Sequence, residues 1–482
     1  MKILLASSEV HPYSKTGGLA DMVGALGRAL LKAGHEVCVV TPLYRGIREK
    51  FPDVHPEDWY LNLPLGDRWI QGALWSVIPE NGLKVYFIEQ TEFFDRAGIY
   101  HEKNVSYPDN DQRYIFFSKA VVHLARYMHW RPDVVHVHDW QVGLVPAMLQ
   151  QLQREGWGNP PPTCLTIHNL AYQGVFPPES FALTGLSKDF FHPNGAEFFG
   201  MLNCLKAGIA FADAITTVSP RYAREISTEE YGCGLDGLLR RRHERIFGIL
   251  NGVDYGEWNT TKNPHLFKPY SVTRLAGKKL NKLELQKFFA LPVNEKIPLF
   301  GTITRLADQK GVDIQLGALE EMLNTNMQFV LLGSGSPDYE RAYKSLAQRF
   351  PTKVAIRIGY DETLAHRIEA ACDFYLMPSQ FEPCGLNQMY SLRYGTIPIV
   401  RATGGLDDSV VDITQDPKLA NGVKFHEYSA RALAKGIRKA LAIHENPELL
   451  RRYQRNAMKA DYSWEQTVSE YVRVYELAGN LF

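Results

Sequence analysis

The sequence has few cysteines, no excess of charge and no long hydrophobic run, and each absence excludes a class of protein. Its six cysteines among 482 residues form no Cys-x-x-Cys pair, which argues against a disulfide framework or a zinc site and suits a reducing cytoplasm. Lys and Arg number 53, as do Asp and Glu, so no overall field attracts nucleic acid or an anionic membrane. No run of about 18 apolar residues predicts a membrane-spanning helix. Nothing indicates an oligomeric state.

What the sequence does contain is a regular alternation of short apolar segments and longer helical patterns. Such alternation predicts parallel sheets built from βαβ units, an α/β fold. The predicted strands are 3–6, 37–41, 85–89, 134–138, 164–168, 214–218 and 246–250, then 299–303, 329–332, 354–358, 374–377 and 397–400. A polar, irregular segment at 255–271 separates the two series, so we expect two doubly wound domains. Ligands of such sheets bind at the carboxyl ends of strands, here in a cleft between the domains.

The loop after the first predicted strand is rich in groups that favour anions. Gly17 and Gly18 let backbone N–H groups approach a ligand closely at the start of a helix. Lys15 adds a positive charge and Asp21 a carboxylate one turn later. The alternative is a tight turn in which Asp21 only complements the helix dipole. A similar Thr-Gly-Gly-Leu sequence recurs at 403–406.

Two further loops carry charged residues at predicted strand ends. Arg305 and Lys310, just after the strand 299–303, suit a diphosphate clamp, or else form a solvated loop with Asp308. Glu382 follows the strand 374–377 and precedes a helical run. A carboxylate there suits substrate hydroxyls or developing positive charge at a sugar carbon, or else complements the helix dipole.

The histidines allow several interpretations. His136 and His138 share one face of a strand, but no third ligand has recognisable spacing, so we expect no metal. His168 ends another strand and is either a core residue or a catalyst. Gly333-Ser334-Gly335 is only a fragment of a dinucleotide-binding fingerprint and is weak evidence for NAD.

Seven segments in order make the chain resemble the glycogen and starch synthase family, in its bacterial ADP-glucose-using form. They are 15–21, 130–140, 166–169, 251–254, 305–311, 379–388 and 403–406. The resemblance implies a GT-B fold: two Rossmann-like domains facing an interdomain cleft, with a C-terminal helix crossing back to the N-terminal domain. The expected domains are 1–255 on the acceptor side, 256–460 for the nucleotide sugar, and the helix at 461–482.

The resemblance also implies roles for individual residues. Arg305 and Lys310 would stabilise the leaving diphosphate, with Lys15, Gly17 and Gly18 closing on it. Asp21, His168, Asn169 and Glu382 would surround the glucose, Tyr360 would stack on adenine, and Tyr100 and His101 would lie near the acceptor. The remaining substrate-binding candidates are Asp139, Asn251, Gln309, Ser379, Cys384, Gly385, Leu386, Thr403, Gly404 and Gly405. We expect Cys384 to be a packed residue rather than a nucleophile.

The activity implied is transfer of glucose from ADP-glucose to the non-reducing end of an α-1,4-glucan with retention of configuration, without metal or cofactor. Asn387 and Asp407 depart from the Thr and Ala more usual in the family, near the donor end of the cleft. The alternatives are another retaining GT-B transferase, with a UDP-glucose donor or a small sugar acceptor, a glucan phosphorylase, or a non-catalytic glucan-binding protein. Tyr390 stands where sucrose- and trehalose-type enzymes often carry a second glutamate.

Overall fold

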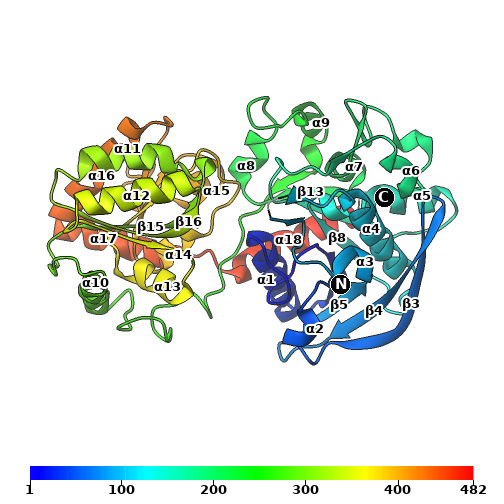
Figure 1. Cartoon of the computed structure of the whole chain (residues 1–482), viewed down its shortest axis with the longest axis horizontal. Helices are drawn as coiled ribbons and strands as arrows, with labels where there is room; N and C mark the ends of the chain where they lie inside the picture. The colour runs from blue at the N-terminus through cyan, green and yellow to red at the C-terminus, as the bar shows by residue number, and fades with distance from the viewer. Residues whose placement is uncertain (104, 481–482) are drawn as a thin grey trace. The chain divides into compact units, whose positions relative to one another are not determined.

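The computed structural model describes residues 1–103 and 105–480, which divide into two compact units (Figure 1). Unit 1 consists of Met1–Gly252 together with the C-terminal residues from Trp464 onward, and unit 2 is Val253–Ser463. Each unit is built on a largely or wholly parallel sheet flanked by helices. No helix among the described residues combines the length and the apolar character needed to cross a membrane.

Unit 1 contains a nine-stranded sheet in the order β14-β13-β9-β8-β1-β2-β5-β4-β3. The strands from β14 to β5 run parallel, and β4 and β3 form an antiparallel extension. Their bounds are β1 Lys2–Ala6, β2 Glu36–Pro42, β3 His55–Leu65, β4 Arg68–Val77, β5 Lys84–Glu89, β8 Val134–His138, β9 Thr163–Ile167, β13 Ala214–Thr217 and β14 Ile246–Gly248. The buried parallel strands explain why the predicted strands are nearly continuous apolar runs.

The helices of unit 1 connect these strands. The longer ones are α1 Gly18–Lys32, α4 Asn110–Tyr127, α5 Val145–Arg154, α7 Cys204–Phe211 and α18 Trp464–Asn480. The shorter ones are α2 Ile47–Lys50, α3 Thr91–Phe94, α6 Ser180–Thr184, α8 Pro220–Glu225, α9 Asp236–Arg241, and the 3-10 turns η1 Trp140–Val142, η2 Lys188–Phe190 and η3 His243–Arg245. Two small sheets complete the unit: β6 His101–Glu102 with β7 Val105–Ser106, and β10 Val175–Phe176, β11 Glu197–Phe198 and β12 Met201–Asn203.

The C-terminal helix α18 packs on unit 1, as the family resemblance implied. Tyr475 is buried and its hydroxyl lies 2.8 Å from Nδ1 of His136 in β8. At the start of the helix, a Cβ at Gly252 would collide with the ring of Trp464. These contacts bind the last turns of the chain to the sheet of its first half.

Unit 2 is a six-stranded parallel sheet in the order β17-β16-β15-β18-β19-β20. The strands are β15 Leu299–Leu306, β16 Gln328–Gly335, β17 Val354–Ile358, β18 Phe374–Met377, β19 Ile397–Arg401 and β20 Val423–Phe425. The helices are α10 Ala276–Phe288, α11 Val312–Met322, α12 Pro337–Arg349, α13 Glu362–Ala371, α14 Asn387–Arg393, α15 Gly404–Ser409, α16 Ala430–Glu445, α17 Pro447–Lys459 and the turn η4 Asp308–Lys310. One core joins the sheet to α11, α12, α16 and α17, and a second core joins its other face to α10 and α13 (Figure 1).

The strand ends differ from the prediction in two informative places. β15 continues to Leu306 and β16 to Gly335, because the parallel register extends to Arg305 opposite Ser334. Arg305 therefore lies within the end of a strand rather than after it, and Gly333-Ser334-Gly335 is strand rather than a dinucleotide-binding turn. The sequence analysis also missed the β3–β4 hairpin, although Leu61, Leu63 and Leu65 alternate with exposed residues as a half-buried strand requires.

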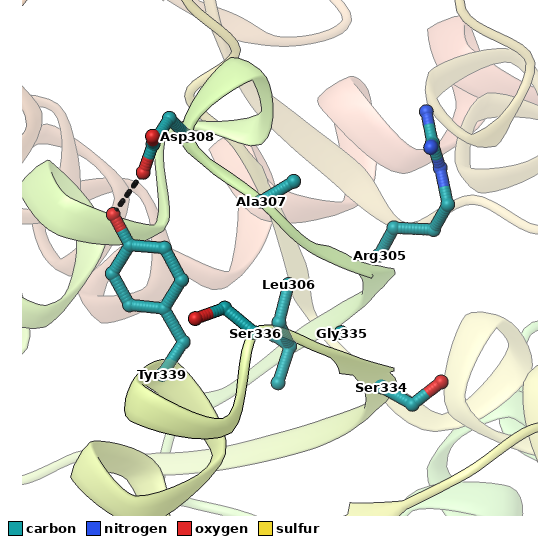
Figure 2. A pocket seen from close by; sticks show the side chains of 8 residues that line it. All are labelled: Arg305, Leu306, Ala307, Asp308, Ser334, Gly335, Ser336 and Tyr339. Carbon is teal, nitrogen blue, oxygen red and sulfur yellow. Dashed lines mark hydrogen bonds between the residues drawn. The ribbon is translucent and has the colours of Figure 1, made fainter. Parts of the chain in front are cut away.

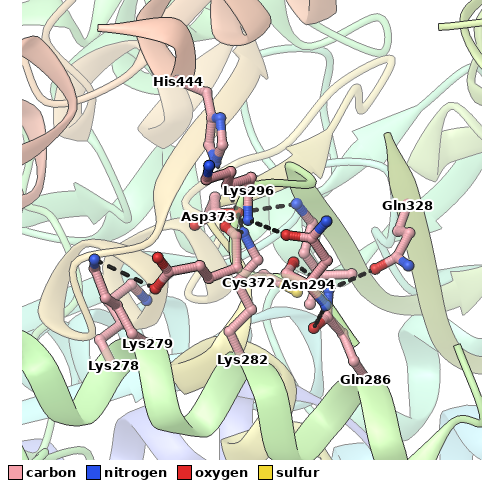
Figure 3. Close-up of polar contacts among 12 residues, drawn as sticks. Lys278, Lys279, Lys282, Gln286, Asn294, Lys296, Gln328, Cys372, Asp373 and His444 are labelled. Atoms are coloured by element: carbon pink, nitrogen blue, oxygen red, sulfur yellow. Dashed lines mark hydrogen bonds and ion pairs between the residues drawn. The ribbon is translucent and has the colours of Figure 1, made fainter. Parts of the chain in front are cut away.

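A buried charged network closes the amino-terminal edge of the sheet of unit 2 (Figure 3). Asp373, just before β18, accepts hydrogen bonds from Nζ of Lys282 at 2.6 Å and from the backbone N–H of Leu299 at 2.9 Å. Nζ of Lys278 donates to Oγ1 of Thr396 at 2.6 Å. These lysines both come from α10, so the network fixes this helix to the edge opposite the strand ends where the predicted site residues lie.

Candidate active site

The Gly-rich loop of unit 1 lies between β1 and α1, as predicted. Nζ of Lys15 forms an ion pair with Oδ2 of Asp21 at 2.7 Å. Gly17 and Gly18 are exposed, and a Cβ at either position would meet no atom within 4 Å. Packing therefore does not demand glycine at these positions, and their open backbone leaves room for a ligand at the N-terminus of α1.

Asp139 and His168 meet at the carboxyl ends of β8 and β9. Oδ1 of Asp139 accepts a hydrogen bond from the backbone N–H of His168 at 2.7 Å. Burial raises the pKa of Asp139 to about 7, against the opposing effect of the backbone N–H groups of His168 and Asn169. Asp139 also has a φ of 60°, an uncommon backbone conformation that recurs at functional sites.

The imidazoles of His138 and His168 are also in contact. Nδ1 of His138 lies 3.1 Å from Nε2 of His168, so one ring donates its N–H to the other. Burial lowers the pKa of His168 to about 3 and holds that of His138 well below its usual value. At neutral pH both rings are therefore uncharged, and His168 can serve as a hydrogen-bonding group rather than as an imidazolium acid.

Three other predicted residues of unit 1 occupy different surroundings. Tyr100 is partly buried, and its hydroxyl donates to Oε1 of Glu9 at 2.6 Å. His101 is exposed in β6. Asn251 is buried beyond the end of β14, and its Oδ1 has no hydrogen-bond partner among the described residues, which leaves a buried acceptor available.

Glu382 is the centre of the predicted residues of unit 2. It is 8% exposed, and its Oε2 accepts bonds from Nζ of Lys310 at 2.6 Å and from Oγ of Ser379 at 3.0 Å. No described residue bonds its Oε1. Gln309 reinforces the arrangement because its Nε2 donates to the carbonyl of Phe381 at 3.2 Å. The turn η4 and the loop after β18 are thus joined around one carboxylate.

The second Gly-rich helix start underlies that carboxylate. The backbone N–H of Gly405 donates to the carbonyl oxygen of Pro383 at 3.1 Å. Gly404 has a φ of +44°, and a Cβ there would overlap the carbonyl oxygen of Glu382. Thr403 and Cys384 are buried beside this contact. Gly404 and Gly405 therefore support the Glu382 loop through the backbone, a role that the sequence did not predict for them.

Arg305 and Tyr360 lie apart from this network. Arg305 is exposed at the end of β15, without a side-chain hydrogen bond or ion pair to any described residue. It lines a cavity of about 390 Å³ with Leu306, Ala307, Asp308, Ser334, Gly335, Ser336 and Tyr339. Figure 2 shows its side chain directed away from the bonded pair Asp308 and Tyr339. Tyr360 follows β17 and is 83% exposed. Gly385 and Leu386 continue the loop to α14.

Histidines that could serve as metal ligands lie in two places. Nδ1 of His136 is bonded to Tyr475, and its Nε2 lies 2.6 Å from Oγ1 of Thr166, so both ring nitrogens are engaged. The described residues include one group of three potential ligands, His265, Glu362 and His366. The planes of the two imidazoles are 11° from parallel, and the rings are stacked. The nitrogen lone pairs, which lie in the ring planes, therefore run in two nearly parallel planes.

Sequence reasoning missed several residues that shape the site. Ser8 and Glu9 are buried at the end of β1 and contact Tyr100. Their signal was present, because a polar run directly after a buried parallel strand lies at the ligand-binding edge of the sheet. Tyr390, which stands where sucrose- and trehalose-type enzymes often carry a second glutamate, stacks its ring on Trp258 with centroids 3.6 Å apart.

Family models match both halves of the chain. The starch synthase catalytic domain matches residues 2–241, and glycosyl transferases group 1 matches residues 284–460. The glycogen synthase of Syntrophotalea carbinolica is 42% identical over 486 residues, covering 100% of this chain and 99% of the relative. That of Anaeromyxobacter sp. is 45% identical over 477 residues, covering 98% and 99%.

Solved structures agree with these relatives. The catalytic domain of starch synthase IV from Arabidopsis thaliana, solved bound to ADP and acarbose, superposes with a TM-score of 0.89 at 34% identity and 99% coverage of both chains. Sucrose-phosphate synthase from Thermosynechococcus elongatus has a TM-score of 0.61 at 18% identity, with 98% of both chains covered. The second likeness shows the fold alone, a GT-B architecture as expected.

Proposed function

The chain belongs to the glycogen and starch synthase family, and on that premise we propose how it acts as a glucosyltransferase that extends glucan chains. The donor we propose is ADP-glucose, which is consistent with the family, and the acceptor is the non-reducing end of an α-1,4-glucan. The scattered cysteines favour a reducing compartment, so a cytoplasmic location stays a prediction of the sequence.

The observation that carries the proposal is the geometry around Glu382. The carboxylate is held through Oε2 by Lys310 and Ser379, which leaves Oε1 for a sugar hydroxyl or for the positive charge that develops at the anomeric carbon. Arg305, exposed at the neighbouring strand end, is a cation available to a diphosphate. A carboxylate and two cations at the ends of adjacent strands suit a sugar joined to a diphosphate.

The transfer exchanges one bond for another. The bond between the anomeric carbon and the diphosphate oxygen breaks, and a bond to the acceptor's 4-hydroxyl oxygen forms with retention of configuration. The hydroxyl proton passes to the departing diphosphate. Lys310 and Arg305 stabilise the negative charge of that leaving group, which lowers the barrier because the charge develops in the transition state.

Unit 1 supplies the complementary groups that we propose contact the substrates. The neutral imidazole of His168 and the amide of Asn169 hydrogen-bond the transferred glucose. Lys15 and the loop at Gly17 and Gly18, where no side chain stands in the way, contact the diphosphate. The ion pair between Lys15 and Asp21 resembles that between Lys310 and Glu382, so each unit presents a cation for phosphate beside a carboxylate for sugar.

The test is transfer of labelled glucose to glycogen from ADP-glucose and, separately, from UDP-glucose. Glu382→Gln should lower kcat about 10²- to 10³-fold, because it removes the charge on an oxygen placed for the transition state. The matched control is Glu369→Gln. Ser391 donates to Oε2 of Glu369 at 2.7 Å, as Ser379 does for Glu382, but burial raises the pKa of Glu369 to about 8, so this carboxyl is already neutral. The control should retain activity.

Other results would select the alternatives. Preference for UDP-glucose would keep the family and change the donor. Incorporation into a small sugar but not into glycogen would favour another retaining transferase. Glycogen binding without turnover of either nucleotide sugar would indicate a glucan-binding protein, and full activity in Glu382→Gln would remove Glu382 from the proposed site.

A further inference from the structure

A carboxylate outside the predicted site, that of Glu9, lies beneath the Gly-rich loop of unit 1. Glu9 follows β1 and is 2% exposed. A buried carboxylate needs hydrogen-bond donors or a cation to offset its loss of hydration. The hydrogen-bond donors to Glu9 come from two predicted binding segments, and no ion pair of Glu9 occurs in the described part of the chain.

The first set of donors comes from the loop itself. The backbone N–H of Thr16 donates to Oε2 of Glu9, the backbone N–H of Gly17 lies 3.4 Å from the same oxygen, and the Thr16 hydroxyl donates to Oε1 at 2.6 Å. Thr16, Gly17 and Gly18 are exposed. Because a Cβ at either glycine would meet no atom within 4 Å, side-chain packing does not hold this part of the loop, whereas three hydrogen bonds tie it to the buried carboxylate.

The second donor comes from the segment predicted on the acceptor side. The hydroxyl of Tyr100 donates to Oε1 of Glu9 at 2.6 Å and lies 2.7 Å from Oγ of Ser8. Burial and the nearby Glu9 charge hold the pKa of Tyr100 well above its usual value, so the phenol stays protonated and keeps donating. One carboxylate therefore joins the Gly-rich loop to Tyr100.

We propose that Glu9 is a positioning residue that holds the Gly-rich loop for the donor's diphosphate and couples it to Tyr100. The proposal rests on the proposed function. The backbone N–H groups of the loop then fall into two groups, those that bond Glu9 and those that face the anion. The N–H groups of Thr16 and Gly17 bond the protein's own carboxylate, so the anion meets the first turn of α1 from Gly18 onward, together with Lys15.

The test compares Glu9→Gln with Asp213→Asn, a matched control in the same unit. Oδ2 of Asp213 accepts the backbone N–H of Thr163 at 2.7 Å and its hydroxyl at 2.8 Å, the same pair of donors that Thr16 offers to Glu9. Glu9→Gln places an NH₂ group or a weaker acceptor against those donors. We expect ADP to bind about 10-fold more weakly or worse, and KM for ADP-glucose to rise similarly, because hydrogen bonds to a charged group are lost. Asp213→Asn should leave both unchanged.

Hydrogen exchange supplies a readout that does not depend on activity. The amides of Thr16 and Gly17 should exchange faster in Glu9→Gln than in the wild type, with no change in Asp213→Asn. Should Glu9→Gln fail to fold, Thr16→Val at an exposed position and Tyr100→Phe each remove one donor, and each should give a smaller loss of the same kind.

Three results would overturn the proposal. They are unchanged loop exchange and ADP affinity in Glu9→Gln, a fall in kcat alone, or an equal loss in Asp213→Asn. If the wild type transfers no glucose, the proposed function fails, while exchange at Thr16 and Gly17 still decides whether Glu9 holds the loop.

Discussion

At the scale of single residues, the two positions that depart from the family pattern have structural partners. Nδ2 of Asn387 donates to the carbonyl of Ile303 at 2.8 Å and to the hydroxyl of Tyr375 at 2.7 Å. Asp407 forms an ion pair with Lys424 at 2.9 Å. Both side chains bond groups of the sheet of unit 2.

This orientation predicts the effect of Asn387→Thr. The substitution should leave the ratio of activities with ADP-glucose and UDP-glucose unchanged, since the side chain faces Ile303 and Tyr375. It should lower the free energy of unfolding by about 1 kcal/mol for each lost hydrogen bond. Initial rates with both donors and a urea titration measure the two effects. A changed donor ratio at unchanged stability would show that Asn387 reads the nucleotide.

At the scale of elements, the start of α15 determines where the Glu382 loop lies. Gly404 has a positive φ, and its missing side chain lets the carbonyl of Glu382 approach. The Thr-Gly-Gly-Leu sequence at 16–19 and 403–406 therefore marks a helix start beside a candidate site residue in both units, but its two copies have different structural roles. At Gly17 and Gly18 the backbone faces open space, whereas at Gly404 it supports another loop.

Gly404→Ala should displace the Glu382 loop and reduce kcat about 100-fold, because misplacement of a catalytic group by about 1 Å has effects of that size. Gly237→Ala is the control. Gly237 lies in α9, where a Cβ would approach only the side chain of Arg240, at 3.9 Å. It should be neutral or slightly stabilising, as alanine favours helix. Kinetics and thermal unfolding check both, and wild-type kcat in Gly404→Ala would contradict this account of the loop.

At the scale of the whole molecule, the histidines buried in unit 1 make its stability depend on pH. Burial lowers the pKa of His136 and of His168 to about 3, and that of His138 well below its usual value. Unfolded histidines bind protons near pH 6.5. Between these values the unfolded state holds more protons, so stability is fully present above about pH 6.5 and is lost as pH falls. Asp139 has the opposite effect on stability, because burial raises its pKa to about 7 and the folded state therefore binds its proton more tightly.

The folded protein should therefore lose stability from pH 7 to pH 5, by up to about 1.4 kcal/mol per pH unit for each buried histidine. Asp139→Asn should steepen the loss, because it removes a group that binds a proton more tightly when folded. His129→Gln, at an exposed position, should leave the slope unchanged. Urea midpoints across this range provide the measurement, and an equal slope in the wild type and in Asp139→Asn would contradict this account of the buried groups.

Much of this architecture follows from sequence alone. Apart from β20 (Val423–Phe425), which the sequence did not predict, the β-branched apolar runs predicted the parallel strands of both units within a few residues. A strand buried on both faces must be apolar throughout. The motifs also pointed to Glu382, Lys310 and Ser379, which the structure brings together. The β3–β4 hairpin was not predicted, because its half-buried strands alternate apolar and exposed residues and contain no continuous apolar run.

Only the tertiary structure decided which groups meet across long sequence distances. Glu9 and Tyr100 are 91 residues apart, and His136 and Tyr475 are 339 apart, so no local pattern reveals their contacts. Likewise, the orientation of Asn387 and the extension of β15 to Arg305 depend on neighbouring strands. Hydrophobic periodicity and residue propensity act between residues close in sequence, and they therefore determine the helices and strands. Burial and hydrogen bonding between distant segments determine which side chains meet in the site and how they are oriented.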